Sequence, residues 1–441
     1  MNVRCLPLSV IPWIALGAPA LAEPNPAAPP SPPPTADNAA AADATPATLD
    51  ARLQALELDL EDLRGENEDL RSELADVKAQ HLANRPAAPL NALNPQITAF
   101  LNGAMRLDDR PVLTPGGIAI NERAFLRTAE FDFRAAVDPY ADAVAILAIE
   151  DEAGEGFGAE LEEAYLVLKR LPLLESAPLG LKLKIGRFRA PLGSANRLHL
   201  HDLPWTTRPL AISRLLGSEN GEFFESGWNP VGVDAELILP ELIPGVVMEV
   251  NADLVDGGSI AVAEGAHDHP GYVGRYNLFF TAADAHDVNL GVSGYYQPGA
   301  HRAGVLALDA LYSWKPAVAG EFRSFVLGGE LFYADRKFLD ETGAEQRAKP
   351  LAGFAFAQLQ LSWHTYLGAR YEYAQELDDD TVATHGAAGY LSYYTSEFLR
   401  FRVGYERRFS DLPADDGRDS LFAEISVVFG SHPTEPYWVH R

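Results

Sequence analysis

The sequence predicts an all-β transmembrane protein, an antiparallel outer-membrane β-barrel of about sixteen strands over residues 94–430, with an N-terminal α-helical coiled coil. Three observations predict this fold. Apolar and polar residues alternate from residue 94 onward, as they do in strands with one buried face. The connections between these segments are alternately short and long. Aromatic residues gather near the segment ends, as they do at the two interfaces of a transmembrane barrel.

Residues 1–22 show the pattern of a secretory signal peptide. Arg4 supplies the positive charge, residues 6–16 are largely apolar, and Ala20 and Ala22 frame a cleavage site. The only cysteine, Cys5, falls inside this segment. We therefore expect no disulfide and no cysteine-bound metal in the mature protein. The formal net charge of −27 argues against nucleic acid as a partner.

Residues 48–80 carry a heptad pattern, between an Ala/Pro-rich disordered linker at 23–47 and a second linker at 81–93. The core positions recur at alternating spacings of four and three residues: Leu49, Leu53, Leu56, Leu60, Leu63, Asn67, Leu70, Leu74 and Val77. This pattern predicts a self-associating coiled coil, whereas a single amphipathic helix packed on a domain would show a wider apolar stripe. Asn67 is typical of parallel dimers, but the leucine-rich core and the barrel favour a homotrimer.

The barrel region divides into sixteen predicted strands. In residues 125–137, for example, Phe131 and Phe133 alternate with Glu130 and Asp132. The predicted strands lie near 96–107, 124–137, 140–151, 159–170, 178–189, 228–240, 245–254, 271–283, 287–297, 304–315, 321–335, 349–364, 366–376, 385–395, 398–409 and 419–430, and a tail follows at 431–441. A soluble β-sandwich is the rival fold, because it shows the same alternation with its polar face toward solvent.

The connections predict the orientation of the barrel. They are very short after the second, sixth, eighth, twelfth and fourteenth predicted strands, and long after the first, fifth, seventh, eleventh and fifteenth. An even number of strands places both termini in the periplasm, where the coiled coil would lie. The longest connection covers 190–227. Because long loops in compact proteins are usually functional, we expect it to enter the barrel as a constriction. The alternative is an exposed lid that stays outside the lumen.

Several segments resemble a family of outer-membrane barrels labelled zinc-regulated or TonB-dependent-receptor-like. The resemblance rests on NALNPQITAFLNGAMRL, ELEEAYLVL, KIGRFRAPLG, HLHDLPWTTRPL and FGSHP, and it covers roughly residues 94–433. The GRFRAPLG piece is also similar to phosphate-selective porins. A TonB-dependent receptor carries a globular plug before its barrel, and only linker and coiled coil precede residue 94 here. The resemblance therefore implies a barrel without a plug.

Basic residues on two strands and in the long loop are the candidate pore-lining and constriction residues. They are Lys182, Lys184, Arg187, Arg189, Arg197, Arg208, Arg214, Arg400 and Arg402. Rings of basic side chains select anions in channels. The alternative is that these residues pair with lumenal acids and leave no net selectivity; the candidate acids are Glu130, Asp132, Glu163, Glu372 and Glu424.

Histidines and aspartates in two loops are candidate metal ligands. His199, His201 and Asp202 lie in the long loop, and His267 and His269 lie in the loop after the seventh predicted strand. Imidazole and carboxylate groups suit zinc. The zinc label of the resembling family describes regulation as much as binding. Histidines that are solvated or packed within loops are the alternative interpretation.

These observations favour a porin-like channel for passive diffusion of small solutes or ions across the outer membrane. Two alternatives stay open: a structural anchor that acts through its coiled coil, and a zinc-uptake channel. We expect no enzyme, because the sequence contains no Gly-x-Ser-x-Gly, His-Glu-x-x-His or phosphate-binding loop. The expected partners are outer-membrane lipid, small solutes and other copies of the chain, with no cofactor apart from possible zinc.

Overall fold

The computed structural model describes the barrel region with short gaps: residues 95–112, 119–120, 122–151, 156–171, 178–217, 223, 227–283, 285–316, 323–340, 342–411 and 417–430. These residues belong to the second of two compact units, residues 88–441. The predicted signal peptide, both linkers, the coiled coil at 48–80 and the tail at 431–441 lie outside the described residues. Within the described part of the chain, no helix has both the length and the apolar character needed to cross a membrane.

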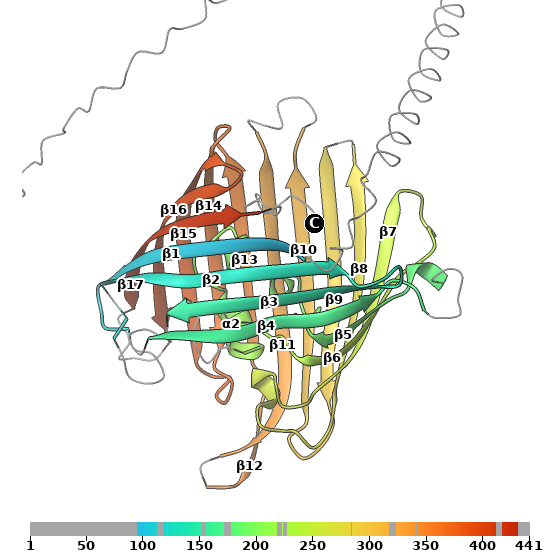
Figure 1. Cartoon of the computed structure of the whole chain (residues 1–441). Coiled ribbons are helices and arrows are strands. Elements are labelled where there is room, and N and C mark those ends of the chain that lie inside the picture. Colours follow the sequence, from blue (N-terminus) through green and yellow to red (C-terminus); the bar gives the residue numbers. More distant parts are fainter. Residues whose placement is uncertain are drawn as a thin grey trace, which may run out of the picture. The chain divides into compact units, whose positions relative to one another are not determined.

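The described strands form one closed antiparallel sheet (Figure 1). In chain order they are β1 (Gln96–Asp108), β2 (Arg123–Ala136), β3 (Ala141–Asp151), β4 (Phe157–Leu168), β5 (Lys182–Arg187), β6 (Val231–Ile238), β7 (Val246–Val255), β8 (Gly271–Ala282), β9 (His286–Gln297), β10 (Ala303–Trp314), β11 (Phe325–Leu339), β12 (Glu345–Ala348), β13 (Leu351–Gln360), β14 (Thr365–Gln375), β15 (Ala383–Ser396), β16 (Leu399–Ser410) and β17 (Arg418–Phe429). Strand β1 pairs with both β2 and β17, which closes the sheet into a barrel.

The closed sheet has sixteen strand positions, as predicted. The short β12 pairs with the end of β11, and β13 pairs with the rest of β11, so these two strands share one position. The loop expected after the eleventh predicted strand is therefore mostly a hairpin, and Figure 1 shows β12 at one tip of the molecule. The predicted strand at 178–189 is shorter than expected, because a 3-10 turn at Pro178–Gly180 precedes β5 and the chain leaves the wall after Arg187.

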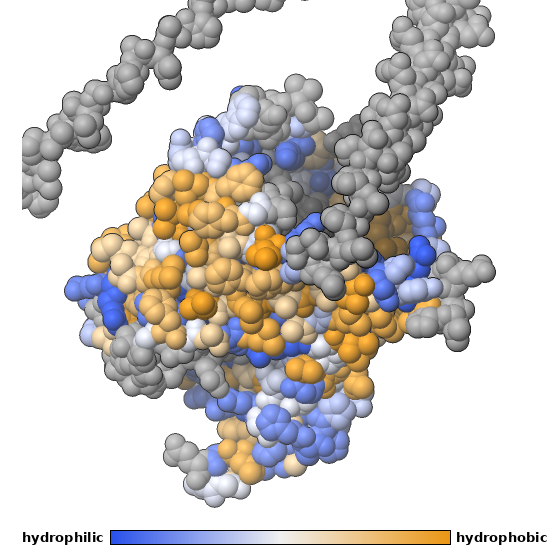
Figure 2. Space-filling model, viewed as in Figure 1, coloured by the Kyte–Doolittle hydropathy of each residue, from blue (hydrophilic) through white to orange (hydrophobic). Residues whose placement is uncertain are grey.

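The barrel wall is apolar outside and polar inside. On β16, Phe401, Val403 and Tyr405 are exposed, while Arg400 and Arg402 are buried. Figure 2 shows hydrophobic residues covering much of the visible outer wall. A soluble sandwich would bury the opposite set of side chains, so that rival fold is wrong. This distribution is the one expected for a barrel whose outer wall faces lipid.

The described residues of the connection from β5 to β6 (188–217, 223 and 227–230) fold back into the barrel, and we call them the inner loop. Its large apolar side chains are almost fully buried: Phe188, Leu192, Leu200, Leu203, Trp205, Leu210, Ile212, Leu215, Leu216 and Trp228. It includes the short helix α2 (Leu210–Leu215), which Figure 1 shows inside the ring of strands. Trp205 packs edge-on against Phe354 and Phe356 of β13, with ring centroids 5.6 and 4.7 Å apart. The inner loop is therefore not an exposed lid.

Candidate functional site

Arginines of the barrel wall hold the inner loop by its main chain. Four hydrogen bonds reach carbonyls of the loop segment 203–207: Arg127 donates to Thr206 (2.5 Å), Arg370 to Thr207 (2.6 Å), and Arg402 to Leu203 (2.8 Å) and Trp205 (2.6 Å). The donors come from β2, β14 and β16. Because a guanidinium offers several donors in a fixed geometry, each arginine can hold a loop carbonyl and a wall carboxylate together.

Acidic residues of the wall accept from main-chain N–H groups of the same loop. Glu330 on β11 accepts from the N–H groups of Ser194 (3.1 Å) and Ala195 (2.6 Å) and from the Ser194 hydroxyl (2.6 Å). Glu372 on β14 accepts from the N–H of Leu210 at 3.1 Å. Gly193 permits this approach: its φ is 73°, and a Cβ there would collide with Glu330 and Phe332.

Glu424 on β17 is the centre of a buried ion-pair network at the seam where the first and last strands meet. It lies 2.8 Å from Arg400, 3.2 Å from Arg402 and 3.5 Å from Arg127. Asn102 of β1 donates to the Glu424 carboxylate at 3.1 Å and accepts from Arg127 at 2.7 Å. The predicted pore-lining residues Arg400 and Arg402 therefore lie in this network beneath the inner loop, paired with an acid, and do not face open space.

The other predicted basic residues fall into two groups. Arg208 is fully buried within the loop and donates to the carbonyls of Ala195 and Leu198. Arg189 is also buried, whereas the remaining five are partly exposed and paired with acids: Lys182 with Glu236, Lys184 with Asp234, Arg187 with Glu160, Arg197 with Glu249, and Arg214 with Glu376. The structure thus places every predicted basic residue next to a carboxylate or a carbonyl.

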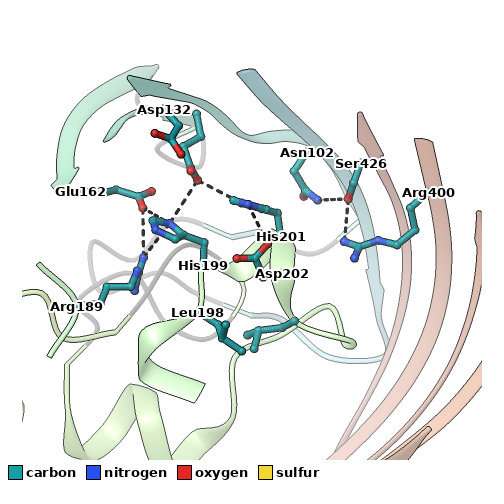
Figure 3. A network of polar contacts seen from close by, with 12 residues as sticks. Asn102, Asp132, Glu162, Arg189, Leu198, His199, His201, Asp202, Arg400 and Ser426 are labelled. Atoms are coloured by element: carbon teal, nitrogen blue, oxygen red, sulfur yellow. Dashed lines mark hydrogen bonds and ion pairs between the residues drawn. The ribbon is translucent and has the colours of Figure 1, made fainter. Parts of the chain in front are cut away.

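The predicted metal ligands His199, His201 and Asp202 lie together in the lumen (Figure 3). Four further buried side chains complete what we call the histidine cluster: Glu130 of β2, Glu162 and Glu163 of β4, and Arg189 of the inner loop. His199 Nδ1 lies 2.7 Å from Glu162 and 3.5 Å from Glu130, and its Nε2 lies 2.8 Å from Glu163. His201 Nδ1 lies 3.2 Å from Glu130, and its Nε2 lies 3.2 Å from Asp202.

The carboxylates of the histidine cluster raise the pKa of both imidazoles. Burial alone would lower the pKa of His199, but Glu130 and Glu162 outweigh it and raise that pKa well above its ordinary value. For His201, burial is opposed by Asp202 and Glu130, which raise the pKa to about 9. The acids around the two imidazoles therefore favour their protonated forms.

Two β-bulges place charged residues of the site on the inner face. The register of β1 and β2 shifts at Asn102 and Gly103, so that Arg127 is the extra residue beside Thr128, and both side chains are buried. The register of β3 and β4 shifts in the same way, and Glu162 is the extra residue beside Glu163. Strict alternation would send Arg127 and Glu162 toward lipid. Sequence reasoning missed both residues because bulges carry no signal in hydrophobic periodicity.

The remaining predicted ligands, His267 and His269, make local contacts in the loop between β7 and β8. The ring of His267 contacts the carbonyl of Gly257 at 2.8 Å through Nδ1, and His269 lies 2.9 Å from Asp268. The structure therefore divides the five predicted metal ligands: three lie in the histidine cluster, and these two are held by their own loop.

Two cavities open near opposite ends of the barrel. One, of about 720 Å³, lies where β2 and β4 end and β3 and β5 begin, and its charged lining includes Arg134, Lys182, Lys184, Asp234 and Glu236. The other, of about 330 Å³, lies near the end of β16 and the start of β17 and is lined by four arginines: Arg110, Arg214, Arg408 and Arg418. The anchored segment of the inner loop, residues 203–207, is held by arginines on the inner face of the wall.

No family model matches the sequence. An uncharacterized protein of Aquifex aeolicus (strain VF5) is 34% identical over 92 residues, which are 21% of this chain and 17% of that relative. The matched region thus spans less than a fifth of the relative's length.

The chain also matches several solved outer-membrane proteins. The outer-membrane channel DcaP of Acinetobacter baumannii matches with a TM-score of 0.46 and 10% identity, over 75% of this chain and 96% of that chain. OmpT of Vibrio cholerae matches with 0.45 and 9%, over 76% and 97%. An anion-selective porin from Comamonas acidovorans gives 0.45 and 9%, over 76% and 98%. None of the matches shows the zinc-regulated or TonB-dependent-receptor-like family named in the resemblance.

Proposed function

We propose that the protein is a channel of the bacterial outer membrane through which small solutes or ions diffuse passively, with the inner loop as its constriction. One observation carries this proposal: a loop from one side of an inside-out barrel is anchored by polar side chains around the lumen, with a cavity near each end. A sixteen-strand barrel is wide enough for water. A loop fixed across that width narrows the passage without blocking it.

The loop anchors also support a passage of constant size. The arginine and glutamate anchors come from β2, β11, β14 and β16, which lie at separate positions around the barrel. Buried polar networks in which each member has partners are rigid. We therefore infer a permanently narrowed channel for small solutes. The proposal includes no catalytic step.

Conductance across a planar lipid bilayer tests the channel. The full-length protein should insert with discrete, voltage-tolerant current steps, because the constriction is built into the fold. A folded barrel that inserts without conducting would overturn the channel. It would favour the structural anchor instead, in which the coiled coil ties the outer membrane to periplasmic partners.

Cysteine labelling in whole cells tests the membrane and the orientation. The sequence contains one cysteine, Cys5, in the predicted signal peptide, so introduced cysteines would be the only ones in the mature protein. Thr342→Cys, in the turn between β11 and β12, should react with a membrane-impermeant maleimide on intact cells. Glu397→Cys, in the short turn after β15, should react only after lysis. The reverse labelling pattern would place the end of the barrel from which the inner loop enters on the periplasmic side. It would contradict the proposed orientation.

For assembly we propose a homotrimer joined through the coiled coil at 48–80. The leucine-rich core positions support association, and a trimeric barrel body would bring three such helices together. Light scattering of the detergent-solubilised full-length protein should give a trimer, and a chain lacking 48–80 should dissociate more readily. A dimer that depends on Asn67 and becomes larger in Asn67→Leu would contradict the trimer and favour the parallel dimer.

A further inference from the structure

We propose that the histidine cluster is a binding site for a divalent transition metal, with zinc as the best match. The ligands are Nδ1 of His199, Nδ1 of His201 and one carboxylate oxygen each from Glu130 and Glu162. The proposal stands on the geometry of these side chains, and it holds whether or not the barrel conducts.

Three of the four ligand atoms already converge, and His201 lies beside them. One ligand atom each of Glu130, Glu162 and His199 lie within 4.8 Å of one another, and all three residues are buried. Both imidazoles turn Nδ1 toward the same Glu130 oxygen, at 3.5 Å from His199 and 3.2 Å from His201. In a tetrahedral zinc site with bonds near 2.0–2.1 Å, neighbouring ligand atoms lie roughly 3.4 Å apart. To admit the ion, the contact of 2.7 Å between His199 and Glu162 must lengthen, and Nδ1 of His201 must join the three atoms that already lie together.

The second nitrogen of each ring has the partner that a metal-bound histidine needs. Nε2 of His199 lies 2.8 Å from Glu163, and Nε2 of His201 lies 3.2 Å from Asp202. A carboxylate that accepts the Nε2 proton fixes the ring and leaves Nδ1 free to bind a metal. The same arrangement occurs twice here, on two histidines that are two residues apart in one loop.

The charges of the cluster favour a dication. Four carboxylates face two imidazoles and one guanidinium. With neutral imidazoles, the cluster therefore has a clear excess of negative charge. Arg189, 3.2 Å from Glu162, would keep its neighbouring contact with Glu163.

The ligand set also selects the class of metal. Two imidazole nitrogens with two carboxylate oxygens suit zinc and its transition-metal neighbours, whereas calcium and magnesium prefer ligand sets made only of oxygen. The site would join three elements: β2 through Glu130, β4 through Glu162, and the inner loop through its two histidines. A bound ion would therefore cross-link the inner loop to β2 and β4, the side of the lumen where ion pairs already hold the loop.

Titration of the full-length protein in detergent tests the site. After removal of metal with a chelator, Co²⁺ should bind one ion per chain with the visible absorption of a tetrahedral site, and Zn²⁺ should displace it. His199→Ala and Glu162→Gln should each weaken binding more than the roughly 10–100-fold expected for Glu163→Gln, which loses only a supporting carboxylate. The matched control is the double substitution His267→Ala with His269→Ala, which removes two loop histidines outside the cluster and should leave binding unchanged.

The outcomes separate cleanly once each variant is shown to be a folded barrel by its heat-dependent mobility on a gel. Binding that survives His199→Ala, or that disappears in the His267→Ala and His269→Ala control, would overturn the assignment. So would a folded wild-type protein that takes up neither Co²⁺ nor Zn²⁺. Failure of conductance would bear on the channel alone and would leave this site as it stands.

Discussion

The inner loop meets two unlike faces of the lumen. Against β13 it inserts Trp205 between aromatic rings, in an apolar cluster of buried residues. Against β2 and β4 it places two histidines among glutamates. The difference teaches that one loop can be held in two ways. Burial of apolar surface supplies free energy with little directional preference. Buried ion pairs add little net stability but are costly to break, so they determine where the loop lies.

Disruption of the apolar contact with β13 should release the inner loop more than any other change. In Trp205→Ala, the ring contacts with Phe354 and Phe356 are lost, and truncation of a buried tryptophan costs about 3–5 kcal/mol. We expect the loop to detach from β13 in a large fraction of molecules, so that limited proteolysis cuts it faster and channel conductance rises. Trp363→Ala is the control, since Trp363 is 54% exposed in a short turn. Equal protease resistance in both variants would show that the apolar face does not hold the loop.

The acidic anchor on β11 gives the next effect. Glu330→Gln keeps the shape of the side chain but removes the charge that accepts from Ser194 and Ala195. A hydrogen bond contributes about 0.5–1.5 kcal/mol net, so proteolysis of the loop should increase less than in Trp205→Ala. Glu345→Gln, on the protruding β11–β12 hairpin, is the matched control and should behave as wild type. A larger loss in Glu330→Gln than in Trp205→Ala would show that the polar anchor holds the loop more strongly than the apolar contact does.

The arginine-lined cavity gives a smaller effect. Arg110→Gln with Arg418→Gln removes two positive charges from its lining. Rings of basic residues favour anions, so the anion-over-cation permeability ratio should fall by roughly twofold while conductance changes little. The reversal potential in a salt gradient measures this ratio. Arg347→Gln, on the β11–β12 hairpin outside the cavity, should leave it unchanged; an equal shift there would mean that surface charge in general sets selectivity.

A change in salt concentration should have the smallest effect on proteolysis of the inner loop. At 1 M ionic strength the Debye length is about 3 Å, which screens exposed charges but affects buried pairs much less. Glu424 and its arginine partners are buried, so loop proteolysis in the wild type should be the same in low and high salt. Digestion of Trp205→Ala at both salt concentrations sharpens the comparison, because that variant depends more on the buried ion pairs. Faster cutting of the wild type in high salt would show that water reaches the charged face.

Much of the wall was predictable from the sequence. Alternation such as that of Arg400 and Arg402 with Phe401 and Val403 reports a two-sided environment, and the short turns fix the antiparallel order. The alternation did not by itself say which face was outside; closure of the sheet decides that. The pairing of His199, His201 and Asp202 in one loop was visible as ligand chemistry, whereas their wall partners were visible only in part.

The remaining features of the site could not be predicted from the sequence, because they depend on strand register and on long-range contacts. Glu130 and Glu163 follow the polar face of their strands, but Arg127 and Glu162 reach the lumen only through bulges. The position of the inner loop depends on wall residues far away in sequence, such as Glu330 for Ser194. His267 shows the opposite case: the same residue type in another loop, with a local carbonyl as its partner.

The seam around Glu424 has a consequence for the order of folding. Asn102 and Glu424 are 322 residues apart in the chain, and their contact forms only when the first strand meets the last. Arg127 bridges Asn102, Glu424 and the Thr206 carbonyl of the inner loop. Contacts of such high sequence separation form late in folding. A long stretch of chain must lose conformational entropy before these contacts can contribute favourable free energy. The loop is therefore fully anchored only after the barrel has closed. The time at which it becomes resistant to protease would report the last step of barrel assembly.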